Sequence, residues 1–520
     1  MSSSQPENYT RNVLTNYLTA IVLVASGFLV TPVLTSHLGV IGFGVWALIG
    51  SLIPYFELLE LGLASSTITY VGRHLEAGEE HLVNRTLNTS FFMLMVPGVL
   101  AAGLAIGVAV LLPDIVHSIP HHYVGQARIL LLLLAFDMVV SIPMDTFGGA
   151  LIAKQRYDLL NASLITVMLL QTFGWFVVLE LHGGLVDMGV VTVAISLCGQ
   201  AARFIMARRL IPSLSVSLRE FDRTIIRSFA VMSGWFSLSE ASGAFIDGMD
   251  IIIVGIVVGL RGAAIFAVGQ RLGKLPSKIM TPPTAVVIPY AARLAGRDDR
   301  QGMRDVNKSV TRKVMALVMP ATLALMLLAT PIVHAWVGPY FHQSAQVVII
   351  LAGSVIAQAI GITPRAVMAG SGQPKAQSVV MGIEAVVHLG LGIVLCRWFG
   401  VLGAPLTGLI CIVSLEGFVL IPILYRKLET PLPTALYAIF RAHAVPVVIS
   451  GAIGWALVKW PLGTFVDHHS RLASVMGVTA AGLIVMMAYY GILFFTGMDP
   501  AERVGMVDWA RSHVPLARSS

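Results

Sequence analysis

Runs of about 20 apolar residues recur along the whole chain and constrain its fold more than any other feature. An α-helix rises about 1.5 Å per residue, so each run is long enough to cross a hydrocarbon core about 30 Å thick. With 56% hydrophobic and 12% charged residues and a mean hydropathy of +0.82, the 520-residue chain has more apolar surface than soluble cores of its size would bury. The sequence therefore predicts an all-α, polytopic membrane protein with no large soluble domain.

Charged residues, proline and glycine divide the apolar runs into about 14 predicted membrane-spanning helices. The first run begins near Asn12 without an A-x-A cleavage pattern, so we expect a retained helix rather than a signal peptide. An even number of spans places both termini on the same side. The predicted spans are 12–36, 40–70, 87–112, 123–150, 159–182, 186–209, 226–258, 260–290, 312–334, 343–368, 376–399, 401–424, 436–460 and 471–496.

Most of the 34 lysine and arginine residues fall in the loops that would share one side of the membrane with the termini. Cytoplasmic loops are enriched in cations, so we predict that both termini are cytoplasmic. The same distribution accounts for the net charge of +7, and no nucleic-acid partner is expected. Cys198, Cys396 and Cys411 lie in predicted spans without C-x-x-C spacing, so neither a disulfide nor a metal site or cofactor is predicted.

The chain also resembles itself at an offset of about 220 residues. LGVIGFGVWAL (38–48) matches VGLRGAAIFAV (258–268), and the same offset carries Tyr70 and Arg73 onto Tyr290 and Arg293. Such a repeat contains six spans, an even number, so the halves should be parallel copies around a central cavity, as in transporters that work by alternating access. The predicted domains are 1–215 (an N-lobe of helices 1–6), 216–425 (a C-lobe of helices 7–12), 426–500 (helices 13 and 14) and 501–520 (a cytoplasmic tail).

Several segments resemble the polysaccharide transporter family of the multidrug/oligosaccharidyl-lipid/polysaccharide flippase superfamily, which includes O-antigen and exopolysaccharide lipid flippases. The resemblance is carried, in order, by GFGVWALIGSLIPYFELLELGL (42–63), DGMDIIIVGIVVGLRGAAIFAVGQRL (247–272), PIVHAWVGPYF (331–341), AVMAGSGQPKAQ (366–377) and FGVLGAPLTGLI (399–410).

This resemblance implies that the chain translocates an undecaprenyl-pyrophosphate-linked oligosaccharide repeat unit across a bacterial cytoplasmic (inner) membrane. It also implies a central cavity lined by cations that meet the pyrophosphate, and a lipid-tail groove formed by helices 13 and 14. The expected partners are the lipid-linked glycan, membrane lipid and polysaccharide polymerase machinery.

Arg271, Lys274 and Lys278 lie in the eighth predicted span at spacings of three and four residues, which places them on one helical face. A charge at mid-bilayer is unfavourable by roughly 2.5–3.5 kcal/mol, so each needs a partner or a watery cavity. We interpret the three cations as candidates for binding the pyrophosphate. The alternative is structural: Asp250 and Asp247, at similar depths in the preceding span, neutralise Arg271 and Lys274, and Lys278 extends to the interface.

Further embedded charges are candidates for ion coupling or substrate binding. Glu57 and Glu60, with Asp247 and Asp250, are interpreted either as a coupling site for H+ or Na+ or as structural charge partners. Arg365 precedes AVMAGSG at the cytoplasmic end of its span and is a fourth candidate for the pyrophosphate, although an arginine that extends to the interface would give the same pattern. Other embedded groups, each equally compatible with an interhelical hydrogen bond, are Asp137, Asp145, Glu240, Glu384, His388 and Glu416.

No G-x-x-x-x-G-K-[ST] loop occurs, so ATP hydrolysis by that route is excluded, and an ion gradient or product removal remains as the energy source. An ion-coupled drug or cation antiporter of the same superfamily is an alternative function, which would recruit the acids rather than the cations. A polyprenyl-dependent membrane glycosyltransferase is less favoured, because its catalytic acids need sizeable outer loops and the predicted ones are short. We therefore predict a transporter and not an enzyme.

Overall fold

The computed structural model describes residues 5–60, 63–223, 225, 234–285, 287–373, 375–459, 471–497 and 503. Within these residues the chain is helical and contains no β-strand. Ten of the described segments are long and apolar enough to cross a membrane, and Ile21–His37 is a shorter apolar helix. The predicted all-α, multi-pass membrane protein is confirmed, while the number of 14 spans stays a prediction. The predicted tail, 501–520, lies outside the described residues except for Arg503.

The chain forms two compact units, each built from two separate segments of the sequence. Unit 1 comprises Met1–Ala267 and Met381–Ala404, and unit 2 comprises Val268–Val380 and Pro405–Ser520. The lobe boundaries at 215 and 425, which rest on the sequence repeat, stay predictions.

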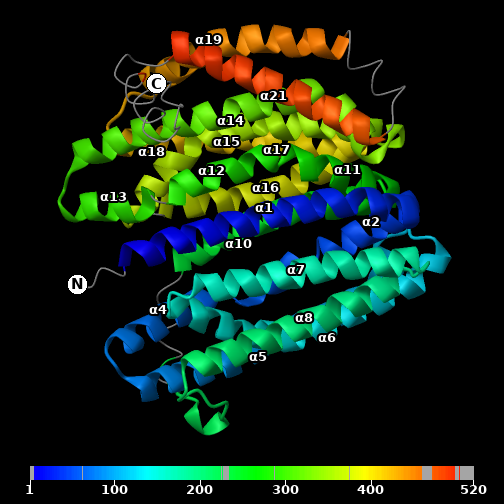
Figure 1. Cartoon of the computed structure of the whole chain (residues 1–520), viewed down its shortest axis with the longest axis vertical. Coiled ribbons are helices and arrows are strands. Elements are labelled where there is room, and N and C mark those ends of the chain that lie inside the picture. The colour runs from blue at the N-terminus through cyan, green and yellow to red at the C-terminus, as the bar shows by residue number, and fades with distance from the viewer. Residues whose placement is uncertain are drawn as a thin grey trace, which may run out of the picture. The chain divides into compact units, whose positions relative to one another are not determined.

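Unit 1 is built mainly from long helices joined by short connections (Figure 1). α5 packs along α6, α6 along α8, and α1 along α7. Its elements are α1 (Gln5–His37), α2 (Gly39–Gly50), α3 (Ile53–Glu57), η1 (Leu58–Glu60), α4 (Leu63–Glu76), α5 (Glu80–Ile115), α6 (His121–Ala153), α7 (Tyr157–Glu180), α8 (Leu185–Leu210), η2 (Leu218–Glu220) and α10 (Gly234–Val257), followed by the first part of α11 (Leu260–Gly273), the second part of α16 (Lys375–Phe399) and η4 (Gly400–Leu402).

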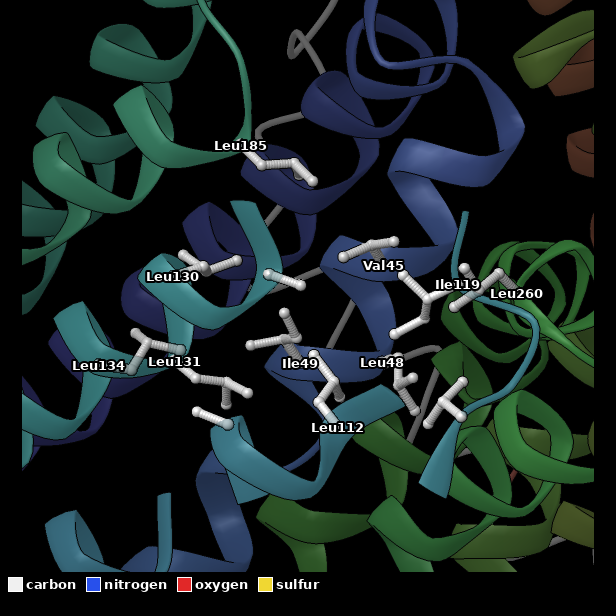
Figure 2. Packing of buried hydrophobic residues seen from close by; sticks show 13 residues of the cluster. Val45, Leu48, Ile49, Leu112, Ile119, Leu130, Leu131, Leu134, Leu185 and Leu260 are labelled. Carbon is white, nitrogen blue, oxygen red and sulfur yellow. The ribbon is translucent and has the colours of Figure 1, made fainter. Parts of the chain in front are cut away.

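A cluster of large aliphatic side chains joins α2, α5, α6, α8 and the start of α11 in unit 1. Figure 2 shows these residues, which include Val45, Leu48, Ile49, Leu112, Leu130, Leu131, Leu185 and Leu260. Gly44 permits a close approach at this point, because a Cβ atom there would overlap the Leu260 backbone carbonyl. Between helices in lipid, such close van der Waals packing contributes to stability where little water is displaced.

Unit 2 contains the remaining helices, among which α14 packs along α15 and against both C-terminal helices, α19 and α21. Its elements are the end of α11, α12 (Leu275–Ala285), α13 (Val287–Gly296), α14 (Arg300–Val337), η3 (Pro339–Phe341), α15 (His342–Gly370), the start of α16, most of α17 (Gly403–Cys411), η5 (Ile412–Leu420), α18 (Ile421–Lys427), α19 (Leu432–Leu457) and α21 (Arg471–Thr496). A buried hydrogen bond of 2.7 Å between His443 Nδ1 and the Tyr489 hydroxyl ties α19 to α21.

The predicted duplication is visible in the order and starting points of the helices. α5 and α14 begin at Glu80 and Arg300, 220 residues apart, and α6 and α15 begin 221 residues apart, at His121 and His342. Two side-chain pairs repeat as well. The guanidinium of Arg73 lies 5.4 Å from the centre of the Tyr70 ring, and that of Arg293 lies 5.4 Å from the centre of the Tyr290 ring.

The second and eighth predicted spans are each divided into short helices. α2 ends at Gly50 and α3 begins at Ile53, and α11 ends at Gly273 before α12 begins at Leu275. A proline follows each break, Pro54 in one and Pro276 in the other, and its missing N–H removes one helical hydrogen bond. Corresponding spans of the two halves are therefore both discontinuous.

The linkers that follow each set of six predicted spans are also held in similar ways. Asn84 Oδ1 on α5 accepts a hydrogen bond from the Ser215 N–H at 3.0 Å, and Asn88 Oδ1 accepts one from the Ser217 N–H at 2.7 Å. In unit 2, Arg304 on α14 donates to the Leu428 carbonyl at 2.9 Å. Each linker is thus fixed to the third span of its own half.

Candidate functional site

Unit 1 contains an acidic cluster, defined here as Glu57, Glu60, Asp137 and Asp145. Glu57 and Glu60 lie at the end of α3 and in η1, the irregular part of the second span, and the two aspartates lie on α6. Both glutamates interact electrostatically with Asp145. A broken helix brings its acids close to those of a neighbouring continuous helix.

Two side chains of α8 contact this cluster. Gln200 Nε2 donates to Asp145 Oδ1 at 3.2 Å, and Arg203 Nη1 lies 3.9 Å from the same oxygen. The cluster therefore pairs four carboxyl groups with one arginine among the described contacts. The Asp145 side chain is 42% exposed and Glu57 is exposed, whereas Asp137 Oδ1 is buried, so the cluster is accessible in part. A partly accessible excess of carboxyl groups in helices of membrane length favours binding of protons or cations.

A second polar site in unit 1 joins α10 to α16. Asp250 Oδ1 lies 2.8 Å from His388 Nε2, and their side chains are only 5% and 1% exposed. Tyr55 on α3 donates to the backbone carbonyl of Phe245 at 2.6 Å, which holds α3 against α10 near Asp250. Asp250 thus has a buried partner within its own unit. Asp247, one turn earlier, is exposed.

The three predicted cations of the eighth span lie around the break between α11 and α12. Arg271 is in the last turn of α11, Lys274 occupies the break, and Lys278 follows on α12. The Lys274 N–H still donates to the Gln270 carbonyl at 3.1 Å, so the backbone continues to turn in a helical sense. Arg271 and Lys278 are exposed and Lys274 is half-buried.

Arg365 lies on α15 and forms an ion pair with Glu416 of η5. The distance from Arg365 Nη1 to Glu416 Oε1 is 2.6 Å, and the two side chains are 15% and 8% exposed. Both residues are recognisable in the sequence as embedded charges, but the sequence gives no sign that they form a pair. The same is true of Asp250 and His388.

The structure therefore distributes the predicted site residues between the two units. Unit 1 holds all the predicted coupling acids and brings Glu57 and Glu60 together with Asp137 and Asp145. Unit 2 holds the four predicted pyrophosphate-binding residues. Gln200 and Arg203 lie within the predicted span 186–209, but the sequence analysis did not single them out, because one glutamine and one arginine near the end of a span give no signal of a contact. Among the described residues, no three His, Cys, Asp or Glu side chains lie close enough to hold a metal ion.

Membrane-length helices, a duplicated element order with two broken spans and several embedded charges are the features of a multi-pass membrane transporter. Solved structures share this fold. The chain is similar to an inward-facing multidrug resistance MATE family transporter of the MOP superfamily, with a TM-score of 0.67 at 16% identity, over 79% of this chain and 95% of that one. It is also similar to the lipid II flippase MurJ in an inward closed conformation, with a TM-score of 0.63 at 12% identity, over 92% and 99% of the two chains.

Residues 71–346 match the model of the family described as polysaccharide biosynthesis protein, and the chain belongs to that family. It is 20% identical over 507 residues to the uncharacterized membrane protein EpsK of Bacillus subtilis, covering 95% of this chain and 96% of EpsK. It is 21% identical over 288 residues to the probable low-salt glycan biosynthesis flippase Agl15 of Haloferax volcanii, covering 54% and 56% of the two chains. These matches confirm the predicted family and the prediction of a transporter rather than an enzyme.

Proposed function

We propose that this protein is a flippase that moves a lipid-linked glycan across the bacterial cytoplasmic membrane by alternating access. The proposed substrate is an undecaprenyl-pyrophosphate-linked oligosaccharide, either an O-antigen or an exopolysaccharide repeat unit. One observation carries the proposal: a chain of the polysaccharide biosynthesis family has Arg271, Lys274 and Lys278 around the break between α11 and α12, in its eighth predicted span, and has Arg365 within the apolar span Pro339–Gly370.

The chemistry of the substrate explains why such cations would be retained. A pyrophosphate cannot enter hydrocarbon unless its negative charge is compensated, and arginine and lysine supply charge-assisted hydrogen bonds to phosphate oxygens. The relative Agl15 is named as a probable glycan biosynthesis flippase, and MurJ, which shares the fold, is a lipid II flippase. Both names agree with a glycan substrate attached to a lipid.

Coupling, orientation and partners form the rest of the proposal. We place the coupling of transport to H+ or Na+ at Glu57, Glu60, Asp247 and Asp250, of which the first two belong to the acidic cluster. Both termini face the cytoplasm, as the loop charges predict. Polysaccharide polymerase machinery would receive the translocated glycan.

Replacing Arg271 or Lys274 with alanine tests the pyrophosphate site. Purified variants are reconstituted in vesicles that carry an undecaprenyl-pyrophosphate-linked oligosaccharide, and transport is followed by the access of an impermeant lectin to the glycan. We expect each variant to lose at least about tenfold in initial rate, because one charge-assisted contact contributes about 1.5–3 kcal/mol. Lys154→Ala, which removes an exposed cation between α6 and α7, is the matched control. Wild-type rates in both Arg271→Ala and Lys274→Ala would exclude these residues from the site.

The acidic cluster favours a second candidate function, an ion-coupled drug or cation antiporter. A partly accessible group of four carboxyl groups with one arginine suits an organic cation better than a pyrophosphate. The same vesicles distinguish the two functions. Uptake of an organic cation driven by an imposed H+ or Na+ gradient, without glycan translocation, would establish the antiporter and exclude the flippase.

A further inference from the structure

The segment that carries Glu416 is a π-helix, an uncommon conformation for nine consecutive residues. It spans Ile412–Leu420 between α17 and α18. The Ile421 N–H donates to the carbonyl of Glu416 five residues earlier, where an α-helix would use the carbonyl of Gly417. π-helical turns occur mostly as single-turn bulges and often lie at functional sites. Returning such a segment to α-helical register would rotate one of its flanks by about 100°.

The contact between Glu416 and Arg365 uses only one atom of each group. Arg365 Nη1 donates to Glu416 Oε1, whereas Glu416 Oε2 is buried and has no hydrogen-bond partner among the described residues. A guanidinium has five N–H donors and can bind a carboxylate through two parallel hydrogen bonds. Gly361, one turn before Arg365, leaves space beside the guanidinium, since a Cβ atom there would lie 3.8 Å from Arg365 Cζ. The pair is therefore incompletely satisfied.

The other charged groups on the elements around this pair are mainly cations. α15 supplies Arg365 itself, and α18 continues from the π-helix to Arg426 and Lys427 at its last turn. Lys427 donates to Gln373 at 3.2 Å. α13, which packs against α15, carries Arg293, whose guanidinium lies over the Tyr290 ring. α12 and α14, which also pack against α15, carry the cations Lys278, Arg304, Lys308, Arg312 and Lys313 and the acid Asp305, which is exposed and accepts a hydrogen bond from Gln301. Glu416 is therefore the acid that the described contacts place beside Arg365.

A phosphate oxygen and the Glu416 carboxylate are alternative partners for Arg365. If the phosphate takes the guanidinium, an ionised Glu416 is left buried without its cation, which is strongly unfavourable. One proton from water on Oε2 removes that charge and gives the side chain an O–H donor. Arg365 stays charged throughout, so one proton enters for each headgroup that binds.

We propose that Glu416 is a proton-binding site that exchanges with the anionic headgroup for Arg365, and that the π-helix is the element that moves when they exchange. The inference rests on the proposed function, because the headgroup is the pyrophosphate of the lipid-linked substrate. It adds a fifth carboxyl group, in unit 2, to the coupling acids of unit 1.

Calorimetric titration of the purified full-length protein with undecaprenyl pyrophosphate, in two buffers of different ionisation enthalpy, tests the exchange. We expect the wild-type protein to take up about one more proton per bound ligand than Glu416→Gln. Glu429→Gln, which removes a carboxyl group paired with Arg300 at the surface, should behave as the wild type.

Equal proton uptake by the wild-type protein and Glu416→Gln would overturn the inference and leave the proposed function intact. Failure of the wild-type protein to bind undecaprenyl pyrophosphate would overturn both. Infrared difference spectra of the wild-type protein supply a test that needs no folded variant. Ligand addition should produce the band of a protonated carboxyl group, and its absence would also exclude the exchange.

Discussion

Gly174 on α7 gives the sharpest test of how closely the helices of unit 1 pack. A Cβ atom at this position would lie 2.6 Å from Val191 Cγ1 on α8, whereas carbon atoms pack at about 3.5–4.0 Å, so Gly174→Ala is short of space by about 0.9 Å or more. A valine in a helix strongly prefers one χ1 rotamer, so rotating its methyl group away from the added Cβ atom is energetically unfavourable. The helices would have to separate, which would stretch the 3.0 Å hydrogen bond from Trp175 Nε1 to Thr192 Oγ1.

Such overpacking typically costs about 1–3 kcal/mol. Replacing glycine by alanine within a helix also contributes about 0.8–1.0 kcal/mol of stability, and Gly103→Ala on α5, with nothing within 4 Å of its added Cβ atom, measures that term alone. We therefore expect the free energy of unfolding of Gly174→Ala, measured by titration with SDS, to be about 1–3 kcal/mol lower than that of Gly103→Ala.

Removing the clash should restore stability. Val191→Ala deletes the obstructing methyl group and leaves Val191 Cβ 3.9 Å away, an ordinary contact. The double variant Gly174→Ala/Val191→Ala should therefore regain about 1–3 kcal/mol relative to the sum of the two single variants. Additive effects in this cycle, or a Gly174→Ala protein as stable as Gly103→Ala, would refute the packing argument.

Two further buried pairs lead to predictions. Tyr489→Phe removes the hydroxyl that bonds to His443, so the free energy of unfolding should fall by about 0.6–1.7 kcal/mol in SDS titration, and an unchanged value would show that the bond is not needed to hold α21 to α19. His388→Ala leaves Asp250 buried without this partner and should lower the free energy of unfolding by about 3–5 kcal/mol. Adding Asp250→Asn to that variant should recover part of the loss. A double variant less stable than His388→Ala would argue against an ionic pair.

The helices and the duplication were predictable because both depend on patterns within short windows of sequence. Apolar runs of membrane length dictate helices, since every backbone N–H and carbonyl must be satisfied within lipid. The match of Tyr70 and Arg73 to Tyr290 and Arg293 predicted a shared structure, and the two cation–π pairs have the same separation of 5.4 Å.

The pairing of embedded charges was not predictable in the same way. Asp250 and His388 are 138 residues apart, and nothing in either local sequence identifies the other as a partner. For Glu416 there is a further reason. Assigning residues to helix faces assumes about 3.6 residues per turn, and the π-helix at Ile412–Leu420 changes that period, so the face on which Glu416 lies cannot be read from spacing.

The two broken spans show how a duplicated scaffold can acquire different chemistry. Charged residues lie close to both breaks, with Glu57 and Glu60 in the short elements α3 and η1 that follow the first break, and Lys274 at the second. Irregular backbone at membrane depth is tolerated where it is buried in protein or lines a watery cavity, and the same surroundings lower the energy of an embedded charge. A break therefore favours a polar or charged side chain but does not specify the sign of its charge. Point substitutions can then make one copy suited to cations or protons and the other to a phosphate, while Pro54 and Pro276 preserve a break in each span.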